Sequence, residues 1–473
     1  MSVQQACTAA EGACDTVVTR PINRVLVFVI VALALLMMSL DGTIVATALP
    51  ALQRGLGTTV NWAGWTLTAY SFGFVVMLPL SGMLSGRYGR RRVFLGSVVT
   101  FTAASLFCGL ADNIFALIAL RALQAAGGAG FTPSATGIIV DHFGDARDRA
   151  VSLFGSIFPI GAMIGPIFGG LFVTYWSWRG VFFVNLPIGA AILVLVLRYI
   201  PRDPPLAKSA APKMDMAGMV LLGIGLLASM VAVSSLGAEK AGPWSAAFVV
   251  PLIIASVTLW LFFRHIKRAA NPFMIPRLIY GSKFGPVNLL NAIYGGFSMG
   301  AMALIPVYAE NRYGLGALDS GTLLVAQGIA TVLLSVTTAL VLRRTGYRLP
   351  LYVGGTVIAA GMFLLARAPA FGLSPYTWLA SSAFLVGLGS GTINPASRIA
   401  GLQLAPEQSS SLAALRSLFL QAGSIVAISI ATAILAVSGM PGAVQASMYA
   451  TLAVLLIVML PVIAKIPEHR GSW

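Results

Sequence analysis

Two ionisable residues stand inside long apolar stretches of this sequence, where charge is rare. Asp41 lies in SLDGTIVATALP and Arg121 in LIALRALQAAGGAG. If both stretches cross a membrane, Asp41 lies eight residues before an outer end at Leu49, roughly 12 Å deep at about 1.5 Å per residue. Arg121 follows its own outer end, Asn113, by eight residues. Because an isolated charge in a bilayer is costly, we expect both side chains to face one cavity and to pair directly or through water.

An acid that exchanges a proton beside an arginine that stays charged can couple proton movement to a substrate. The arginine or a cationic substrate favours the charged carboxylate, whereas desolvation favours the neutral form. Substrate and proton could then compete, which is the logic of an antiporter. The alternative is that Asp41 and Arg121 only anchor packing at outer span ends. Glu310 and Asp319, in ENRYGLGALDS, are second-rank coupling candidates, for which an exposed loop is the competing interpretation.

The composition excludes a water-soluble globular protein. Of the 473 residues, 58% are hydrophobic and 9% are charged, whereas soluble domains carry roughly 25% charged residues. The net charge of +16 would favour nucleic-acid binding in a soluble chain, but here membrane topology explains it better. The three cysteines and three histidines form no metal-ligand or nucleophile–base constellation. We therefore expect no enzyme activity, no metal, no nucleic-acid partner and no cofactor, with a proton gradient as the energy source.

Apolar runs of about 20 residues predict fourteen transmembrane helices in an all-α polytopic membrane protein. Their approximate ranges are 25–49, 62–82, 93–112, 113–139, 150–174, 180–200, 216–236, 245–263, 284–309, 319–342, 350–368, 377–400, 411–437 and 444–464. Alternating sides place most of the 30 Lys and Arg residues on one side, as the positive-inside rule requires of the cytoplasm. Both termini are therefore expected in the cytoplasm. The absence of an N-x-[ST] sequon favours a bacterial source, and hence the bacterial inner membrane.

Loop lengths predict how the chain is divided. The proline-rich segment PRDPPLAKSAAPKMD follows the sixth span and is typical of a linker between two bundles. The predicted parts are a cytoplasmic tail at 1–24, a six-helix bundle at 25–200, inner loops with an inserted two-helix hairpin at 201–283 (spans 216–236 and 245–263), a second six-helix bundle at 284–464 and a cytoplasmic tail at 465–473.

The fifth span carries a glycine stripe in GAMIGPIFGG. Gly161, Gly165 and Gly169 recur every four residues, and Pro166 weakens the helical hydrogen-bond ladder beside them. This pattern predicts a very close helix approach with a bend. Small residues at this spacing are common in membrane helices, but Gly-Pro followed by Gly169-Gly170 is more specific.

The turn between the second and third spans is GMLSGRYGRRRVFL, which contains Gly82, Arg87, Gly89, Arg90 and Arg91. Its glycines permit a tight turn, and its arginines could hold acidic lipid or helix C-termini at the cytoplasmic face. The alternative is a simple positive-inside anchor. A looser echo, LRRTGYRLP, follows the tenth span and indicates an internal repeat.

Taken in order, these motifs resemble the major facilitator superfamily, specifically its fourteen-span drug:proton antiporter branch, from about residue 25 to 464. LDGTIVATALP resembles the first-span signature, GMLSGRYGRRR the loop motif, RALQAAGGAG the fourth-span basic motif, GAMIGPIFGG the antiporter motif and WSWRGVFFVNLPIG the start of span six. The resemblance implies two pseudo-symmetric six-helix bundles that rock around a central cavity. It also implies that Asp41 is the embedded acid, that Arg121 takes part in proton coupling, that the fifth-span glycines line the hinge and that the arginine loop is a cytoplasmic gate.

The sequence departs from the pattern of this family at three positions. Gly86 stands where the loop motif usually carries an acid, so the interaction of that acid must be absent or replaced. Ala46 replaces the usual asparagine of the first-span signature, and Ala125 replaces a glycine of the fourth-span motif. Asp41 and Arg121 themselves are kept.

The function expected from these features is proton-coupled efflux of amphipathic, drug-like or lipid-like compounds by alternating access. Proton-coupled uptake or exchange of a specific metabolite is the alternative. A channel or a membrane lipid-handling protein stays open as a different class. The expected partners are an amphipathic small molecule, protons and membrane lipids, and the chain is expected to act as a monomer.

Overall fold

The computed structural model describes residues 24–143, 157–203, 215–235, 245–269, 272, 274–281, 283–402, 404, 409–436, 440–466 and 468. Every regular element in these residues is a helix. Nearly all of the predicted N-terminal tail, most of the linker and the end of the C-terminal tail lie outside the described residues. The fold is therefore described from the helices alone.

The first half of the chain forms a group of helices that pack chiefly against one another. The contacts between α1 and α7, between α2 and α4, and between α3 and α9 are extensive. Short breaks divide two of the predicted spans into α4 with α5 and α8 with α9. The elements are α1 (Arg24–Gly55), α2 (Val60–Tyr88), α3 (Arg90–Leu110), α4 (Ile114–Ala129), α5 (Phe131–Phe143), α7 (Ile157–Tyr175), α8 (Gly180–Phe183) and α9 (Asn185–Tyr199).

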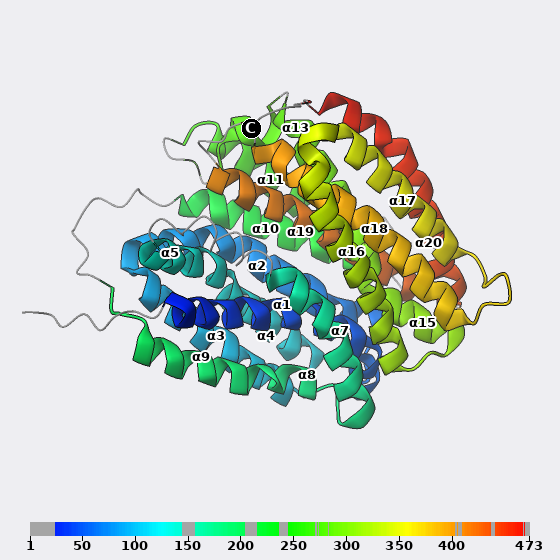
Figure 1. Ribbon diagram of the computed structural model, residues 1–473, viewed down its shortest axis with the longest axis horizontal. Coiled ribbons are helices and arrows are strands. Elements are labelled where there is room, and N and C mark those ends of the chain that lie inside the picture. The colour runs from blue at the N-terminus through cyan, green and yellow to red at the C-terminus, as the bar shows by residue number, and fades with distance from the viewer. Residues whose placement is uncertain are drawn as a thin grey trace, which may run out of the picture.

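The second half forms a corresponding group after two intervening helices. In Figure 1, the intervening pair α10 (Met216–Ser235) and α11 (Ala246–Ile266) lies beside α2 and α19, and α10 contacts both. The elements that follow are α12 (Pro276–Tyr280), α13 (Phe284–Tyr294), the π-helix η4 (Gly295–Gly300), α14 (Ala301–Ala303), α15 (Ile305–Tyr313), α16 (Ala317–Thr345), α17 (Arg348–Ala366), α18 (Pro375–Leu402), α19 (Ser409–Ala436), α20 (Pro441–Met459) and η6 (Leu460–Lys465).

The helices support a polytopic membrane protein but a smaller count of spans than the sequence predicts. Within the described residues, ten helices are long and apolar enough to cross a membrane, or twelve if two bent pairs each form one span. The bent pairs are α2, which bends near residue 79, and the run from α13 to α15. Helices α7 and α18 occupy the two other predicted positions, but neither is among the ten to twelve. Fourteen spans therefore stay a prediction.

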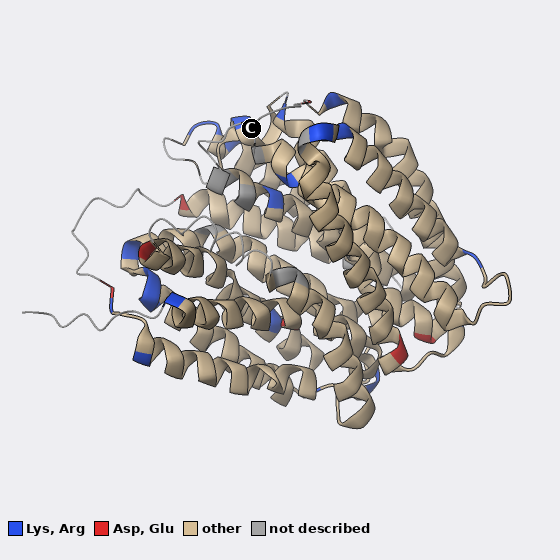
Figure 2. Ribbon diagram, viewed as in Figure 1, with Lys and Arg blue, Asp and Glu red and all other residues tan. Residues whose placement is uncertain are grey.

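Basic residues gather at one end of each helix group. Figure 2 shows most of the Lys and Arg positions, in blue, toward the left and the top of the view, and few charged positions along the middle of the helices. The Lys and Arg residues that the sequence analysis places on one side of the membrane thus gather at one end of each helix group.

The two groups meet at the other end, through small residues. A Cβ atom on Gly64 of α2 would lie 3.1 Å from the Cβ of Thr432 of α19. A Cβ atom on Gly170 of α7 would lie 2.8 Å from the Cα of Leu318 of α16. Glycine at both positions lets the backbones approach closely, so the groups are joined where α1, α7, α15 and α16 converge (Figure 1).

The glycine stripe of α7 lies against α1 and not between the two groups. A Cβ atom on Gly161 would contact Ser39, one on Gly165 would contact Thr43, and one on Gly169 would contact Thr47. The hinge role that the resemblance implies for this face stays a prediction. The spacing predicts a stripe correctly, but it does not say which neighbour the stripe faces. The opposite side of α7 supplies the surface between the two groups, through Gly170 and the backbone of Pro166, which lies against Gly321.

Gly165→Ala should destabilise the protein, because its Cβ would fall on the Thr43 side chain and within 2.8 Å of the Leu40 carbonyl oxygen. Overpacking of this kind costs about 1–3 kcal/mol. The matched control is Gly96→Ala, an exposed glycine of α3 with no atom within 4 Å of the added Cβ. Thermal unfolding of the purified variants in detergent should show a lower Tm for Gly165→Ala only. Equal Tm values would contradict the close packing of α1 and α7.

Candidate functional site

Asp41 and Arg121 form a buried ion pair in the middle of the first helix group. Arg121 Nη1 donates to Asp41 Oδ2 at 2.7 Å, and both side chains are 0% exposed. Asp41 lies in the middle of α1, and Arg121 lies two turns after Asn113, whose side chain caps the start of α4 by accepting from the Phe115 amide. The two opposite-running helices thus bring the charges to one depth, as the sequence predicts.

Two amide side chains complete the surroundings of the Asp41 carboxylate. Gln124 Nε2 and Asn185 Nδ2 donate to Asp41 Oδ1 at 2.8 and 2.7 Å. Asn185 also donates to Ser105 Oγ at 3.0 Å, and Gln124 Oε1 accepts from Arg121 Nη1 at 2.7 Å. All three groups that reach Asp41 are N–H donors, which suits an ionised carboxylate that has only acceptor sites.

Aromatic rings enclose the cation of the pair. The Arg121 guanidinium carbon lies 4.2 Å from the ring centroid of Tyr70 and 5.6 Å from that of Phe182. Nη2 has no hydrogen-bond partner among the described residues, so the ring faces are its contacts. In this conformation amide side chains and aromatic rings enclose the pair. The cavity that the sequence predicts beside both charges stays a prediction.

The break between α8 and α9 positions Asn185. The chain leaves α8 at Phe183, and Asn185 is the first residue of α9. Its Oδ1 is buried and has no hydrogen-bond partner among the described residues, whereas both ends of the Gln124 amide are bonded. Sequence reasoning did not single out either amide. Each could have been found as an uncharged polar residue near the depth of Asp41 in a neighbouring span.

The arginine loop is held within the first helix group. Arg90 Nη1 donates to Asp141 Oδ1 and to the Gly137 carbonyl oxygen of α5, both at 2.5 Å. Asp203, just after α9, accepts from the Arg91 and Arg92 amides at 2.9 and 3.0 Å and so caps α3. Gly89 has φ +98° and a Cβ there would collide with Asp203, which explains the glycine.

The remaining residues of the arginine loop, Gly82 and Arg87, are packed less closely. Gly82 faces Pro133 of α5, with 3.9 Å from an added Cβ to its side chain. Arg87 is exposed and lies over the Tyr88 ring at 5.5 Å. An added Cβ at Gly86, in the last turn of α2, would meet nothing within 4 Å.

The second-rank acids occupy the end where the helix groups meet. Glu310 of α15 forms an ion pair with Arg54 at the end of α1. Asp319 is exposed in the first turn of α16. Neither acid reaches the Asp41 network.

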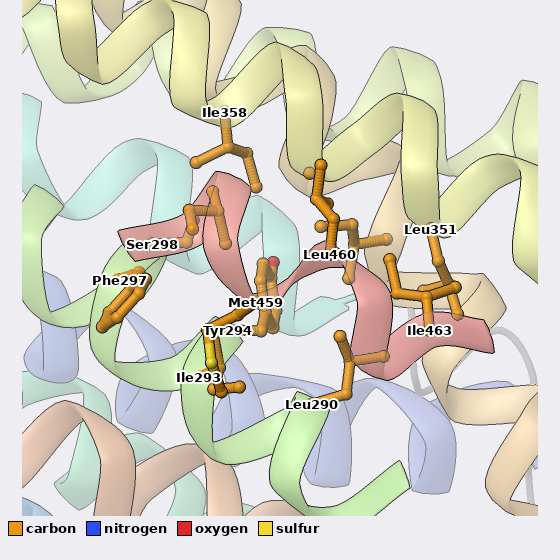
Figure 3. Close-up of a pocket in the computed structure, with 13 residues that line it drawn as sticks. Leu290, Ile293, Tyr294, Phe297, Ser298, Leu351, Ile358, Met459, Leu460 and Ile463 are labelled. Carbon is orange, nitrogen blue, oxygen red and sulfur yellow. The ribbon is translucent and has the colours of Figure 1, made fainter. Parts of the chain in front are cut away.

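An apolar pocket lies elsewhere, inside the second helix group (Figure 3). Its walls come from α13, η4, α17, α18, α20 and η6, and only Tyr294 and Ser298 bring polar atoms from their side chains. The pocket contains no residue of the Asp41 network. Among the described residues, no group of three or more His, Cys, Asp or Glu side chains could hold a metal ion.

Comparison with curated proteins finds bacterial relatives. The chain is 31% identical over 374 residues to an uncharacterized MFS-type transporter of Mycobacterium tuberculosis, covering 78% of this chain and 53% of the relative. It thus spans about half the length of that relative. It is 31% identical over 409 residues to a multidrug resistance protein B homolog of the same species, covering 86% and 74% of the two chains. It is 28% identical to multidrug resistance protein 3 of Bacillus subtilis, covering 80% and 72%.

Solved structures and a family model agree on the fold. A peptide transporter POT in complex with sulfate matches with a TM-score of 0.67 at 16% identity, covering 94% of this chain and 96% of the other. The inward-open xylose transporter XylE from E. coli matches with a TM-score of 0.61 at 14% identity, covering 94% and 97%. The model of the Major Facilitator Superfamily matches residues 31–218 and 213–427. This integral membrane protein therefore belongs to the Major Facilitator Superfamily, a family of transporters and not of enzymes.

Proposed function

We propose that the protein is a proton-coupled antiporter that exports amphipathic compounds by alternating access. The observation that carries the proposal is the fully buried Asp41–Arg121 pair, an exchangeable acid beside a permanent cation inside a transporter fold. The names of the relatives, which include multidrug resistance proteins of two bacteria, support export of drug-like compounds. The substrate side is the less constrained part of the proposal.

In this proposal, Asp41 carries the proton, and Arg121 promotes its release by stabilising the charged carboxylate. With the pair formed, Asp41 accepts three N–H bonds and is held as a carboxylate. A proton on Asp41 would have to displace one of these donors, and the Asn185 amide can turn because its Oδ1 is unbonded among the described residues. Protonation would weaken the bond to Arg121, and the helices α1 and α4 would then be free to shift against one another.

Alternating access would use the two helix groups as its moving parts. They meet at the end where Arg54 pairs with Glu310 and Gly64 lies against Thr432. Positive-inside reasoning makes this the outer end, so the described conformation is closed to the outside. Opening it requires these contacts to separate while others form at the arginine-rich end. The proposal also includes two six-helix bundles, cytoplasmic termini and a monomeric chain.

Asp41→Asn should abolish proton-driven transport, because the amide keeps the shape of the side chain but cannot exchange a proton. It should also lower the Tm, because it leaves Arg121 as a buried unpaired cation. Inside-out vesicles or proteoliposomes with an imposed pH gradient give the measurement, with a fluorescent amphiphile as substrate. The matched control is Asp112→Asn, whose carboxylate is 89% exposed. Unchanged gradient-driven transport in Asp41→Asn would refute the assignment of the proton site.

Removing the cation alone should lower the Tm more than neutralising both partners of the pair. Arg121→Ala leaves a buried unpaired carboxylate, which costs about 3–5 kcal/mol, and should lower both Tm and transport. Arg121→Lys keeps the charge, and we expect it to retain part of the activity. The double variant Asp41→Asn with Arg121→Gln should recover much of the Tm and none of the coupling. Equal activity in Arg121→Lys and Arg121→Ala would argue against the role of the cation.

A disulfide between α2 and α19 should lock the closed end. In a chain without Cys7 and Cys14, Gly64→Cys with Thr432→Cys places two thiols on Cβ atoms 3.1 Å apart in this conformation, close enough to bridge after a small adjustment. Oxidation should stop transport, and reduction should restore it, whereas either single variant should be insensitive. Full transport by the cross-linked protein would contradict opening at this end.

A further inference from the structure

A second arginine, Arg416, lies inside an apolar helix without the partners that Arg121 has. It follows the start of α19 by seven residues, roughly 10 Å along the helix, and falls in the span-like stretch Leu415–Ala436. Its Nη2 donates to Asn394 Oδ1 at 2.5 Å and lies 3.4 Å from Ser397 Oγ. Its Nε is buried with no hydrogen-bond partner among the described residues. The residue as a whole is partly buried.

The charge of Arg416 is not balanced within the described part of the chain. None of the ion pairs there includes Arg416. The other charged side chain acting on it is Arg398, a further cation. Asn394 and Ser397 supply oxygen acceptors but no negative charge. Charges in the middle of a membrane protein are normally paired or mark a substrate pathway, so the missing anion is a specific feature of this position.

Arg416 lies away from the end where the helix groups meet. Thr432, which contacts Gly64 there, follows Arg416 on the same helix by sixteen residues, roughly 24 Å. Arg416 connects α19 to α18, although these two helices pack mainly against other neighbours. Arg416 therefore lies near the end of α19 that is opposite to this contact.

An aromatic side chain and an apolar pocket lie near this cation. Tyr294 is close enough to Arg416 to interact with it electrostatically, and the Tyr294 hydroxyl is hydrogen-bonded to Ser298 and Ser390. The same tyrosine lines the apolar pocket of Figure 3, together with Ile393, the residue before Asn394. A cation next to such a surface suits a ligand that combines an anionic group with an apolar body.

We propose that Arg416, oriented by Asn394, binds the anionic group of an amphipathic substrate, such as a carboxylate, sulfonate or phosphate. Guanidinium is suited to this role because its donors match the acceptor geometry of these groups. The inference deepens the proposed export function and rests on it. Substrate and proton would then use separate charges, with the proton on Asp41 in the first helix group and the substrate anion on Arg416 in the second.

The test uses two dyes that differ at one group. Rhodamine 110 carries a free carboxylate, and rhodamine 123 is its methyl ester. Gradient-driven transport of both is measured in proteoliposomes with the wild-type chain, Arg416→Gln, Arg416→Lys and the control Arg344→Gln, which neutralises an exposed arginine of α16. Arg416→Gln should lower kcat/KM for rhodamine 110 about tenfold or more, as expected for a charged hydrogen bond, and change that for rhodamine 123 less than twofold. Arg416→Lys should fall between.

The outcomes separate the inference from the function on which it rests. Equal losses for both dyes in a variant of wild-type Tm, or no loss for either, would overturn the anion site and leave export standing. If the wild-type chain transports neither dye, the proposed export of such compounds fails. The anion site is then tested by fluorescence polarisation, which measures the binding of rhodamine 110 to the purified protein. An unchanged Kd for rhodamine 110 in Arg416→Gln would overturn the anion site. If Arg416→Gln does not fold, Arg416→Lys and Asn394→Ala carry the same comparison.

Discussion

The contact between Asp41 and Arg121 constrains the whole first half of the molecule. Two charges with no exposed surface are tolerable in a membrane protein only when each is matched by opposite charge and by hydrogen bonds. The match here draws on five helices: Asp41 from α1, Tyr70 from α2, Ser105 from α3, Arg121 from α4 and Asn185 from α9. Any displacement of one helix in this group therefore changes the balance of charge at the centre. A transporter needs that property if protonation at one atom is to move whole helices.

The two halves of the chain surround their arginines differently. Arg121 is neutralised by Asp41, so in the proposed mechanism its surroundings would respond to a proton that removes the charge of Asp41. Arg416 has only neutral acceptors among the described residues, so in the proposed mechanism its surroundings would respond to an anionic substrate. Coupling between these two responses would have to pass through the surfaces where α7 meets α16 and α2 meets α19. At those surfaces Gly64 lies against the Thr432 side chain and Gly170 against the Leu318 backbone, and such tight contacts favour two distinct arrangements over a continuous range.

The sequence predicted the positions of helices along the chain and the depth of their charges, but not their rotation. Equal distances from two outer ends put Asp41 and Arg121 at one level because the rise of a helix is constant. Which way a helix faces depends on packing against segments remote in sequence, so the spacing at Gly165 indicated a close contact without showing that α1 is the neighbour. Gln124 and Asn185 escaped notice because an amide has no distinctive spacing. Asp203 escaped because a single acid in a loop shows no sign of which helix end it will cap.

The loop between α2 and α3 is held by an acid from a remote segment. An added Cβ at Gly86 would meet nothing within 4 Å. The helix end at Arg91 and Arg92 needs acceptors for its first amides, because these have no partner within the helix. Asp203 supplies them from the segment that follows α9, and Gly89 makes the room. The cap ties α3 to the start of the predicted linker, so this linker is anchored to the arginine loop at the point where it leaves the first helix group.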